Sequence, residues 1–391
     1  MSGTPRSVGA SRPPPGPFRP GTFRSRLHSE WIASWLGVAL GISFVVCFLT
    51  GLLSHVIQNP PAWFHYPSRP AGLYRVTQGL HVATGIASIP LLLAKLWTVY
   101  PKLWRWPPAE SVVHAVERLS LLPLVGGSVF LLFSGAFNTF HWYPWTFYFP
   151  TAHFWAAWIT IGALVVHVGA KASGLRAGLA GSHEPAEDST GEVGLGRRSF
   201  LRAVLGASGV LTLATIGQTW NPLGRIALLA PRRPDAGPQG FPVNRPAIEA
   251  RVASRALDPG YRLRIEGAVA SPLALSLDDL KALPQHDAEL PISCVEGWSV
   301  SAGWTGVRLR DLLAMAGSTM RAGARVESLE PRGNYRISVL DPSHASDPDT
   351  LLALRVRGEP LSLDHGYPAR LIAPNLPGVM QTKWVSRIVV L

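Results

Sequence analysis

Charged side chains are missing from four long stretches, and these gaps constrain the fold more than any other feature of the chain. They run from Trp31 to Ser68, Val76 to Ala94, Leu119 to Ala170 and Ala203 to Gly224. The third gap has room for two membrane passes, because polar and aromatic residues interrupt it at 141–145. A spanning helix needs about 20 mostly apolar residues. The pattern therefore predicts five spanning helices.

The positive charges favour one orientation of these helices. The first four are expected at Trp31–His55, Tyr74–Trp97, Ser111–Phe137 and Thr151–Ala172, and the fifth follows Arg197. The segments predicted to lie inside carry six basic residues, whereas the outer loops carry only Arg69 and Arg75; the six are Lys95, Lys102, Arg105, Arg118, Lys171 and Arg176. Basic loops stay on the cytoplasmic side. We therefore expect a multi-pass protein of the cell membrane, with a cytoplasmic N-terminus and an extracytoplasmic C-terminal domain. The net charge of +12 is assigned to this orientation and not to nucleic acid.

The chain divides by composition into six segments. Residues 1–30 form a Pro- and Gly-rich cytoplasmic tail, 31–172 a four-helix membrane domain, and 173–196 a cytoplasmic linker. Residues 197–224 hold an arginine pair and the fifth helix, 225–246 form a Pro-rich spacer, and 247–391 have the ordinary charge content of a soluble domain. The Arg-Arg-Ser-Phe-Leu order from Arg197 resembles a twin-arginine export signal, which carries folded domains across a membrane. An ordinary positive flank of a membrane helix is the alternative.

The last segment predicts a strand-rich α+β domain. Residues Tyr261–Gly267 alternate between apolar and polar side chains, as a half-buried strand does. Short helices are expected at Ser276–Ala282, where Ser276 is the N-cap, and at Arg308–Ala316.

Histidines inside the apolar segments are candidate metal ligands. His153 and His167 are 14 residues apart in one predicted helix, on nearly the same face and about 21 Å apart along its axis. Neutral imidazole is a common axial ligand of heme iron. This spacing predicts an outer heme held by His153 with His81 or His55, and an inner heme held by His167 with His114. Taken singly, each histidine is also compatible with an interface or buried structural role.

Residues 31–172 resemble the four-helix b-type cytochromes of bacterial respiratory chains, which include membrane partners of periplasmic molybdoenzymes. This resemblance rests on the placement of the histidines named above. It implies one or two b-type hemes and exchange of electrons with the quinone pool of the bilayer.

Cys294 lies in Cys-Val-Glu-Gly-Trp, and the other cysteine, Cys47, falls in an apolar run. No disulfide is expected between them. By residue type alone, a lone thiol is either an inert buried side chain or a reactive group, and a soft thiolate is also a ligand for a soft or high-valent metal.

Residues 261–391 resemble the molybdopterin-binding domain of the sulfite oxidase family, which includes periplasmic protein-methionine-sulfoxide reductases. Besides the Cys294 stretch, the motifs are Leu-Asp-Asp-Leu from Leu277, Trp-Thr-Gly-Val from Trp304, Gly-Glu-Pro-Leu from Gly358 and Asp-His-Gly-Tyr-Pro-Ala-Arg from Asp364. The resemblance implies that Cys294 is the molybdenum ligand and that the cofactor is also contacted by His365, Gly366, Arg370 and Lys383. Arg357 departs from the pattern, because many relatives carry Asn at this position.

Together these features predict a membrane-bound oxidoreductase with a molybdopterin and one or two hemes b. It would transfer an oxygen atom to or from a small oxo compound or a sulfoxide, including a protein sulfoxide. The alternatives are a heme electron conduit for a separate enzyme and a membrane-anchored binding module with a non-catalytic molybdopterin-like domain.

Overall fold

The computed structural model describes residues 14–19, 22–23, 25–107, 111–180, 196–216, 219, 223–230, 232–233, 235–319 and 322–391. Most of the predicted tail, and the predicted linker from residue 181 to 195, lie outside the described residues. The chain forms two compact units that alternate along the sequence. The first comprises Met1–Phe48, Thr84–Gly135 and Phe147–Leu211, and the second comprises Leu49–Ala83, Ala136–Thr146 and Thr212–Leu391.

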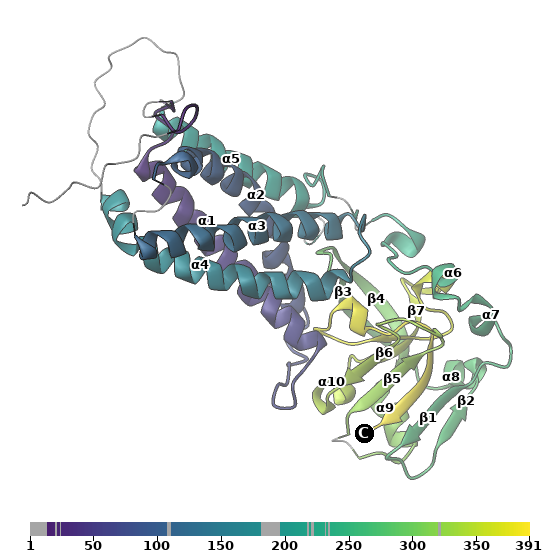
Figure 1. The fold of residues 1–391 in the computed structure, drawn as a ribbon. Helices are drawn as coiled ribbons and strands as arrows, with labels where there is room; N and C mark the ends of the chain where they lie inside the picture. The colour runs from purple at the N-terminus through teal and green to yellow at the C-terminus, as the bar shows by residue number, and fades with distance from the viewer. Residues whose placement is uncertain are drawn as a thin grey trace, which may run out of the picture. The chain divides into compact units, whose positions relative to one another are not determined.

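Five helices within the described residues are long and apolar enough to cross a membrane. They are α1 (Glu30–Gln58), α2 (Leu73–Val99), α3 (Val112–Thr139), α4 (Phe149–Ala180) and α5 (Arg197–Ile216) (Figure 1). The prediction of five long apolar helices is therefore confirmed. Helix α4 continues eight residues beyond its predicted end at Ala172, because Ala, Leu and Arg in the following segment are good helix formers.

The rest of the chain is strand-rich, as predicted, and its helices are short. The helices are α6 (Ala247–Ala250), α7 (Ala253–Ala256), α8 (Leu277–Ala282), α9 (Leu309–Met315) and α10 (Pro342–Ser346). The strands are β1 (Leu263–Gly267), β2 (Leu273–Leu275), β3 (His286–Ser293), β4 (Ser299–Arg308), β5 (Ala324–Ser328), β6 (Ile337–Leu340), β7 (Leu351–Val356), β8 (Glu359–Pro360), β9 (Arg370–Ile372) and β10 (Val385–Val390).

Local sequence explains the predicted elements. In α8 the Ser276 hydroxyl accepts from the Asp279 amide while the Asp279 side chain accepts from the Ser276 amide. This capping box satisfies amides at the start of the helix that have no partner within it. Strand β1 buries Leu263 and Ile265 and exposes Arg264, which is the alternation that the sequence predicts.

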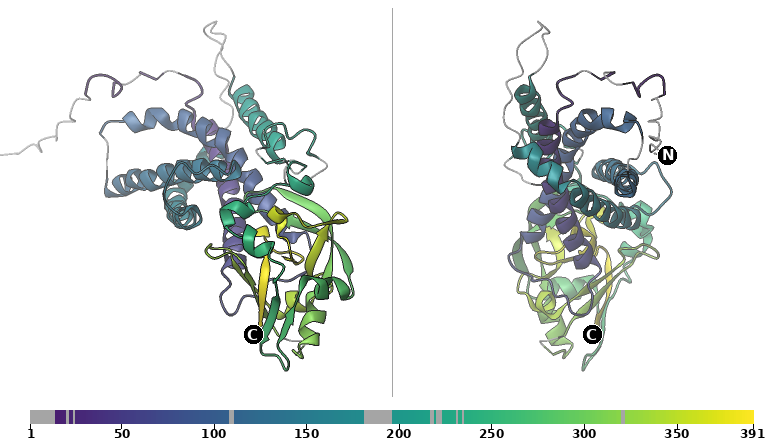
Figure 2. Two further views of the ribbon diagram at one scale, coloured as in Figure 1. Left: turned by 90° about the vertical axis from the view of Figure 1, so that its right-hand side faces the viewer. Right: turned by 60° about the vertical axis from the view of Figure 1, so that its left-hand side comes forward.

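The strands form two sheets. In the first the order is β2-β1-β10-β5-β6, with β1 and β10 parallel and the other neighbours antiparallel. In the second the order is β3-β4-β7-β8, with β9 also paired to β7. Figure 2 shows the yellow strand β10 among the strands that precede it in the chain. The first sheet packs with α8 and α9 in one apolar core, while much of the second sheet lines another core that contains Cys294.

The connection between α1 and α2 packs on the C-terminal residues of the second unit. Asn375 is 2% exposed; its Nδ2 donates to the Pro67 carbonyl at 2.7 Å, and its Oδ1 accepts from the Tyr74 amide at 2.7 Å and from the Tyr66 hydroxyl at 3.3 Å. Arg69 makes two hydrogen bonds to Asp347, of 2.9 and 3.1 Å. We call the contacts of Asn375 the Asn375 clamp, because they hold the start of α2.

Candidate functional site

Cys294 follows the last residue of β3 and begins a tight turn into β4. Its amide donates to the Trp298 carbonyl at 2.8 Å, and the Gly297 amide donates to the Cys294 carbonyl at 3.0 Å. Gly297 has a φ of +96°, a left-handed conformation that glycine adopts without a steric penalty. Residues 294–298 are called the Cys294 turn below. The hairpin of β3 and β4 fixes this turn, so the thiol has a defined position.

The Cys294 thiol is buried beside a hydrogen-bond donor. The side chain is 4% exposed, and Asn244 Nδ2 lies 2.9 Å from its sulfur. Burial and the nearby Glu296 carboxylate raise the pKa of Cys294 well above its ordinary value. A bound metal ion reverses this balance, since it stabilises the thiolate directly. The donor from Asn244 suits a sulfur that carries negative charge.

Glu296 brings charged groups to the same turn. Its carboxylate is 3% exposed and lies 3.5 Å from His141 Nε2 and 3.8 Å from Arg232 Nε. Burial raises the pKa of Glu296 to about 7, against the opposing effect of the Arg232 charge. Sequence reasoning set His141 aside as an outer-loop residue and did not select Glu296, Arg232 or Asn244. The fold brings all four to the Cys294 turn.

Gln78 of α2 and Thr219, which lies after the end of α5, contact the backbone of this turn. Gln78 donates from Nε2 to the Val295 carbonyl at 2.6 Å. The Thr219 hydroxyl donates to the Gly297 carbonyl. The two side chains thus supply partners to backbone acceptors of the turn. Sequence reasoning did not find either contact, because each joins residues more than 70 positions apart.

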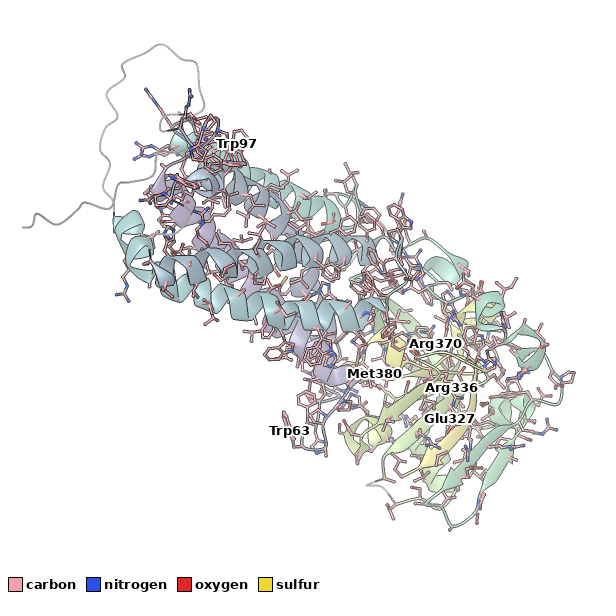
Figure 3. All side chains as sticks on the ribbon, viewed as in Figure 1. Trp63, Trp97, Glu327, Arg336, Arg370 and Met380 are labelled. Carbon is pink, nitrogen blue, oxygen red and sulfur yellow. The ribbon has the colours of Figure 1, made fainter. Side chains whose placement is uncertain are left out.

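The four other predicted cofactor-binding residues come together around Gly366. Arg370 Nη1 donates to the His365 carbonyl at 3.2 Å, and Lys383 Nζ donates to the Asp364 carbonyl at 3.0 Å. Gly366 has a φ of +112°, and a Cβ there would lie 3.2 Å from the Cβ atoms of both Arg370 and Lys383. Glycine is therefore needed for this close approach. Figure 3 labels Arg370 within the strand-rich part of the chain.

These basic groups are held in an apolar setting. His365 stacks on Phe241 with ring centroids 3.8 Å apart, and the Arg370 guanidinium lies 5.6 Å from the centroid of Trp304. Burial lowers the pKa of Arg370 to about 9, that of Lys383 to about 7 and that of His365 to about 3. Arg370 Nε is buried and has no hydrogen-bond partner within the part of the chain that the structure describes. His365 is therefore neutral at pH 7, whereas Arg370 is a buried cation with an unused donor, which fits an anionic group such as a phosphate.

We call His365, Gly366, Arg370 and Lys383 the basic cluster. Two of its members border the apolar core that contains Cys294, because His365 stacks on Phe241 and Arg370 lies near Trp304, and both aromatic residues belong to that core. The arrangement joins a soft metal ligand to a set of anion-binding donors. This combination fits a metal complex with an anionic organic ligand.

Two of the predicted heme ligands have a hydroxyl at Nδ1. His81 Nδ1 lies 3.3 Å from Thr50 Oγ1, and His153 Nδ1 lies 3.1 Å from Ser134 Oγ. The Ser134 hydroxyl donates to the Leu131 carbonyl at 3.4 Å, so it accepts from His153. In His153, Nδ1 then carries the proton and Nε2 has the lone pair, which is the arrangement of a metal-binding histidine.

Small residues adjoin both of these imidazoles. A Cβ on Gly51 would lie 2.9 Å from His81 Cε1, and a Cβ on Gly135 would lie 3.5 Å from His153 Cε1. At Gly51 the distance is too short for a Cβ, so glycine is needed for the His81 ring to lie against α1. At Gly135 the distance is that of an ordinary van der Waals contact.

The remaining candidates differ in their surroundings. His167 Nδ1 is buried without a hydrogen-bond partner among the described residues, so, unlike His153, this imidazole has no contact that assigns the lone pair to Nε2. His114 lies in the first turn of α3, and His55 lies in the last turn of α1. The described residues contain no cluster of three or more His, Cys, Asp or Glu side chains that could hold a metal ion. A heme needs at most two such ligands, so this finding leaves the heme prediction untested.

The comparisons with known proteins concern the strand-rich part of the chain. The Oxidoreductase molybdopterin binding domain family matches residues 250–391. Mitochondrial sulfite oxidase of Rattus norvegicus is 35% identical over 160 residues, which cover 34% of this chain and 29% of that protein. The uncharacterized oxidoreductase YuiH of Bacillus subtilis is 35% identical over 129 residues, covering 33% of this chain and 64% of YuiH.

A third relative is described as the putative protein-methionine-sulfoxide reductase subunit YedZ1 of Azospira oryzae. It is 32% identical over 130 residues, covering 33% of this chain and 48% of that protein. The chain thus spans less than a third of the mitochondrial sulfite oxidase and less than two thirds of either bacterial relative. The C-terminal region of this chain therefore carries an oxidoreductase molybdopterin-binding domain that is similar to the sulfite oxidases.

Proposed function

We propose that this chain is a membrane-bound molybdopterin oxidoreductase that exchanges electrons among the quinone pool, b-type heme in the helices and a molybdenum centre at Cys294. The observation that carries the proposal is that one apolar core contains the buried Cys294 thiol and is bordered, through Trp304, by Arg370. Arg370 is a buried arginine whose Nε has no hydrogen-bond partner among the described residues. A molybdopterin would supply a soft metal for the Cys294 thiolate and an anionic group for the Arg370 guanidinium.

In this proposal each polar group at the molybdenum site has a defined task. Cys294 binds the metal, which when loaded supplies two-electron oxygen-atom transfer. Asn244 orients the sulfur by its hydrogen bond of 2.9 Å. Arg370 and Lys383 bind the anionic part of the pterin, and Gly366 allows the backbone to approach it. His365 is held by its ring stack and by donating from Nε2 to the Pro238 carbonyl at 2.7 Å.

The hemes are assigned to the helical segments. His153 is a ligand of the outer heme, together with His81 or His55, and His167 with His114 holds the inner one. The hydroxyl contacts at Nδ1 of His81 and His153 support the outer-heme assignment. The inner-heme assignment rests on the four-turn spacing of His153 and His167. The five apolar helices are compatible with a membrane anchor. The basic residues favour a cytoplasmic N-terminus, and the Arg197-Arg198 pair favours export of the C-terminal domain in folded form.

The substrate class follows from the chemistry of such a centre. An oxygen atom moves to or from a small oxo compound or a sulfoxide, and two electrons move the other way. The names of the relatives, sulfite oxidase and putative protein-methionine-sulfoxide reductase subunit, belong to this reaction class. Electrons enter or leave as quinol or quinone in the bilayer.

The direct test is metal analysis of the purified protein together with a reduced-minus-oxidised heme spectrum. We expect molybdenum in one-to-one ratio with the chain and a b-type heme signal. Replacing His167 with alanine removes the inner heme and leaves the outer one. An unchanged heme-to-protein ratio in that variant refutes the inner-heme assignment, and absence of molybdenum from the parent protein refutes the proposed function.

A further inference from the structure

One turn of α2 contacts the Cys294 turn directly. Gln78 is 5% exposed, and its Nε2 donates to the carbonyl of Val295, the residue that follows Cys294. The bond length of 2.6 Å is short for an amide donor. Gln78 therefore does more than pack in the interior, because its side-chain amide binds the residue next to the candidate metal ligand Cys294.

The next residue of α2 makes a second approach to the same turn. A Cβ on Gly79 would lie 2.8 Å from Thr219 Cγ2, so only glycine lets the helix come this close. The Thr219 hydroxyl in turn donates to the carbonyl of Gly297. Two consecutive residues of α2 therefore reach the Cys294 turn, one directly and one through Thr219.

His81 belongs to the same turn of α2. It follows Gln78 by three residues, so the two side chains are neighbours on the helix surface, with about 4.5 Å of rise between them. The contact between His81 and Thr50 turns Nδ1 toward α1. One helical turn thus carries a candidate heme ligand at one end and a contact to the candidate molybdenum ligand at the other.

We propose that residues 78–81 form the electron-transfer link between the outer heme and the molybdenum centre, with Gln78 as the positioning residue that closes it. The proposal rests on the proposed function and takes His81 as the outer heme ligand. From the Cys294 sulfur, the link runs through the Val295 peptide, across the hydrogen bond to Gln78 and along the backbone to His81. Every step except the hydrogen bond is a covalent bond.

The electrons balance as follows in the reducing direction. A quinol in the bilayer loses two electrons and two protons and becomes a quinone, and each heme carries one electron at a time. Two successive transfers through the link deliver two electrons to the molybdenum site. There the sulfur–oxygen bond of a sulfoxide breaks, and the oxygen leaves as water with two protons. Oxidation of a substrate uses the same link in reverse.

The experiment compares Gln78→Met with a matched control, Gln58→Met, in the full-length protein. Methionine keeps the length of the side chain and removes the amide donor. Gln58 is in the same unit, and its Nε2 donates to the carbonyl and the hydroxyl of Ser54 in its own helix. Heme and molybdenum contents are measured first. Hemes reduced beforehand are then mixed with methionine sulfoxide, and their reoxidation is followed by absorbance; turnover with a reduced viologen dye is measured separately.

If Gln78 closes the link, Gln78→Met reoxidises its hemes several-fold more slowly than the parent, while dye-driven turnover is unchanged and Gln58→Met behaves as the parent. Reoxidation at the parental rate in Gln78→Met overturns the link and leaves the proposed function standing. An equal fall in both rates also overturns it, because Gln78 then only shapes the Cys294 turn. A parent protein whose hemes are absent, or whose hemes are neither reoxidised by methionine sulfoxide nor reduced by sulfite, overturns the proposed function and the link with it.

A second variant covers the case in which Gln78→Met loses a cofactor. Gln78→Leu has an apolar side chain of similar volume and no donor for the Val295 carbonyl in any protonation state. The same slow reoxidation is expected in this variant. Parental reoxidation in Gln78→Leu counts against the link as it does in Gln78→Met.

Discussion

Replacing Asn375 with alanine removes the Asn375 clamp, which lies outside both candidate cofactor sites. The side chain is buried, and two of its hydrogen bonds, to the Pro67 carbonyl and from the Tyr74 amide, are 2.7 Å long. The third, from the Tyr66 hydroxyl, is weaker at 3.3 Å. The backbone bond from the Asn375 amide to the Ala71 carbonyl survives the change.

The free-energy cost of Asn375→Ala comes mainly from the polar groups that lose their hydrogen-bond partner. A buried polar group without a partner costs about 1–3 kcal/mol, and Asn375→Ala orphans one donor and one acceptor. Asn375 also has a φ of +56°, where alanine pays about 1 kcal/mol more than asparagine. With the weaker Tyr66 bond left out, these contributions together predict that the clamped segment opens about 3–7 kcal/mol more easily.

Hydrogen exchange at the Tyr74 amide measures this opening directly. Each 1.4 kcal/mol is about a tenfold change in an equilibrium, so we expect exchange at least about a hundredfold faster in Asn375→Ala. Asn375→Gly loses the same bonds without the φ penalty and should exchange about fivefold more slowly than Asn375→Ala. Amides of β1 should keep their parental rates in both variants. Tyr74 exchange within about threefold of the parent in Asn375→Ala would show that the clamp contributes little.

Three further predictions concern the molybdenum site and export. Cys294→Ser should be exported and keep its hemes but lose turnover and the thiolate-dependent paramagnetic signal of molybdenum; a merely buried cysteine would cost about 1 kcal/mol and leave turnover intact. Changing both Arg197 and Arg198 to lysine keeps the positive charge beside the fifth helix, yet we expect it to keep the C-terminal domain in the cytoplasm. A reporter fused after Leu391 measures the location of this domain. Normal export of the double variant would favour a simple topology signal. Burial lowers the pKa of Lys383 from 10.5 to about 7, so between these pH values the unfolded chain holds a proton that the folded chain lacks. The thermal midpoint of the cofactor-free protein should therefore rise from pH 7 to pH 9, and Lys383→Met should flatten this rise; an equal rise in both proteins would assign it to other groups.

The elements that could be predicted are those whose causes are local. The apolar runs fixed the five long helices, and Ser276 with Asp279 marked the start of α8. The order of the strands had no such signal. Parallel pairing of β1 with β10 joins Arg264 to Arg387, and no pattern within either strand selects that partner.

The site divides in the same way. Cys294 and the basic cluster were found through motifs whose residues lie close together in sequence, and their roles stay predictions. Asn244, His141 and Gln78 were missed because each meets the Cys294 turn only after the chain has folded. His141 was set aside because it falls in a predicted outer loop, far in sequence from Cys294.

Arg357 has a backbone conformation that accounts for the expectation of asparagine at this position. Its φ is +51°, a left-handed conformation in which asparagine is favoured among residues with a side chain. The Arg357 amide donates to the Gly303 carbonyl at 2.8 Å, and the guanidinium lies 6.0 Å from the centroid of Phe241. An asparagine would suit the same turn, whereas the arginine also places a cation beside the ring on which His365 stacks.

The place of β10 in its sheet has a consequence for biosynthesis. This strand follows all the others in the chain, yet it lies between β1 and β5. While the ribosome is still making residues before Val385, β1 and β5 have no strand to join them, and this sheet is two separate pieces. Lys383, in the basic cluster, is made just before that strand. A cofactor that needs Lys383 and the closed sheet can be inserted only after translation has passed Val390, so any export machinery that accepts folded domains must wait for the last strand.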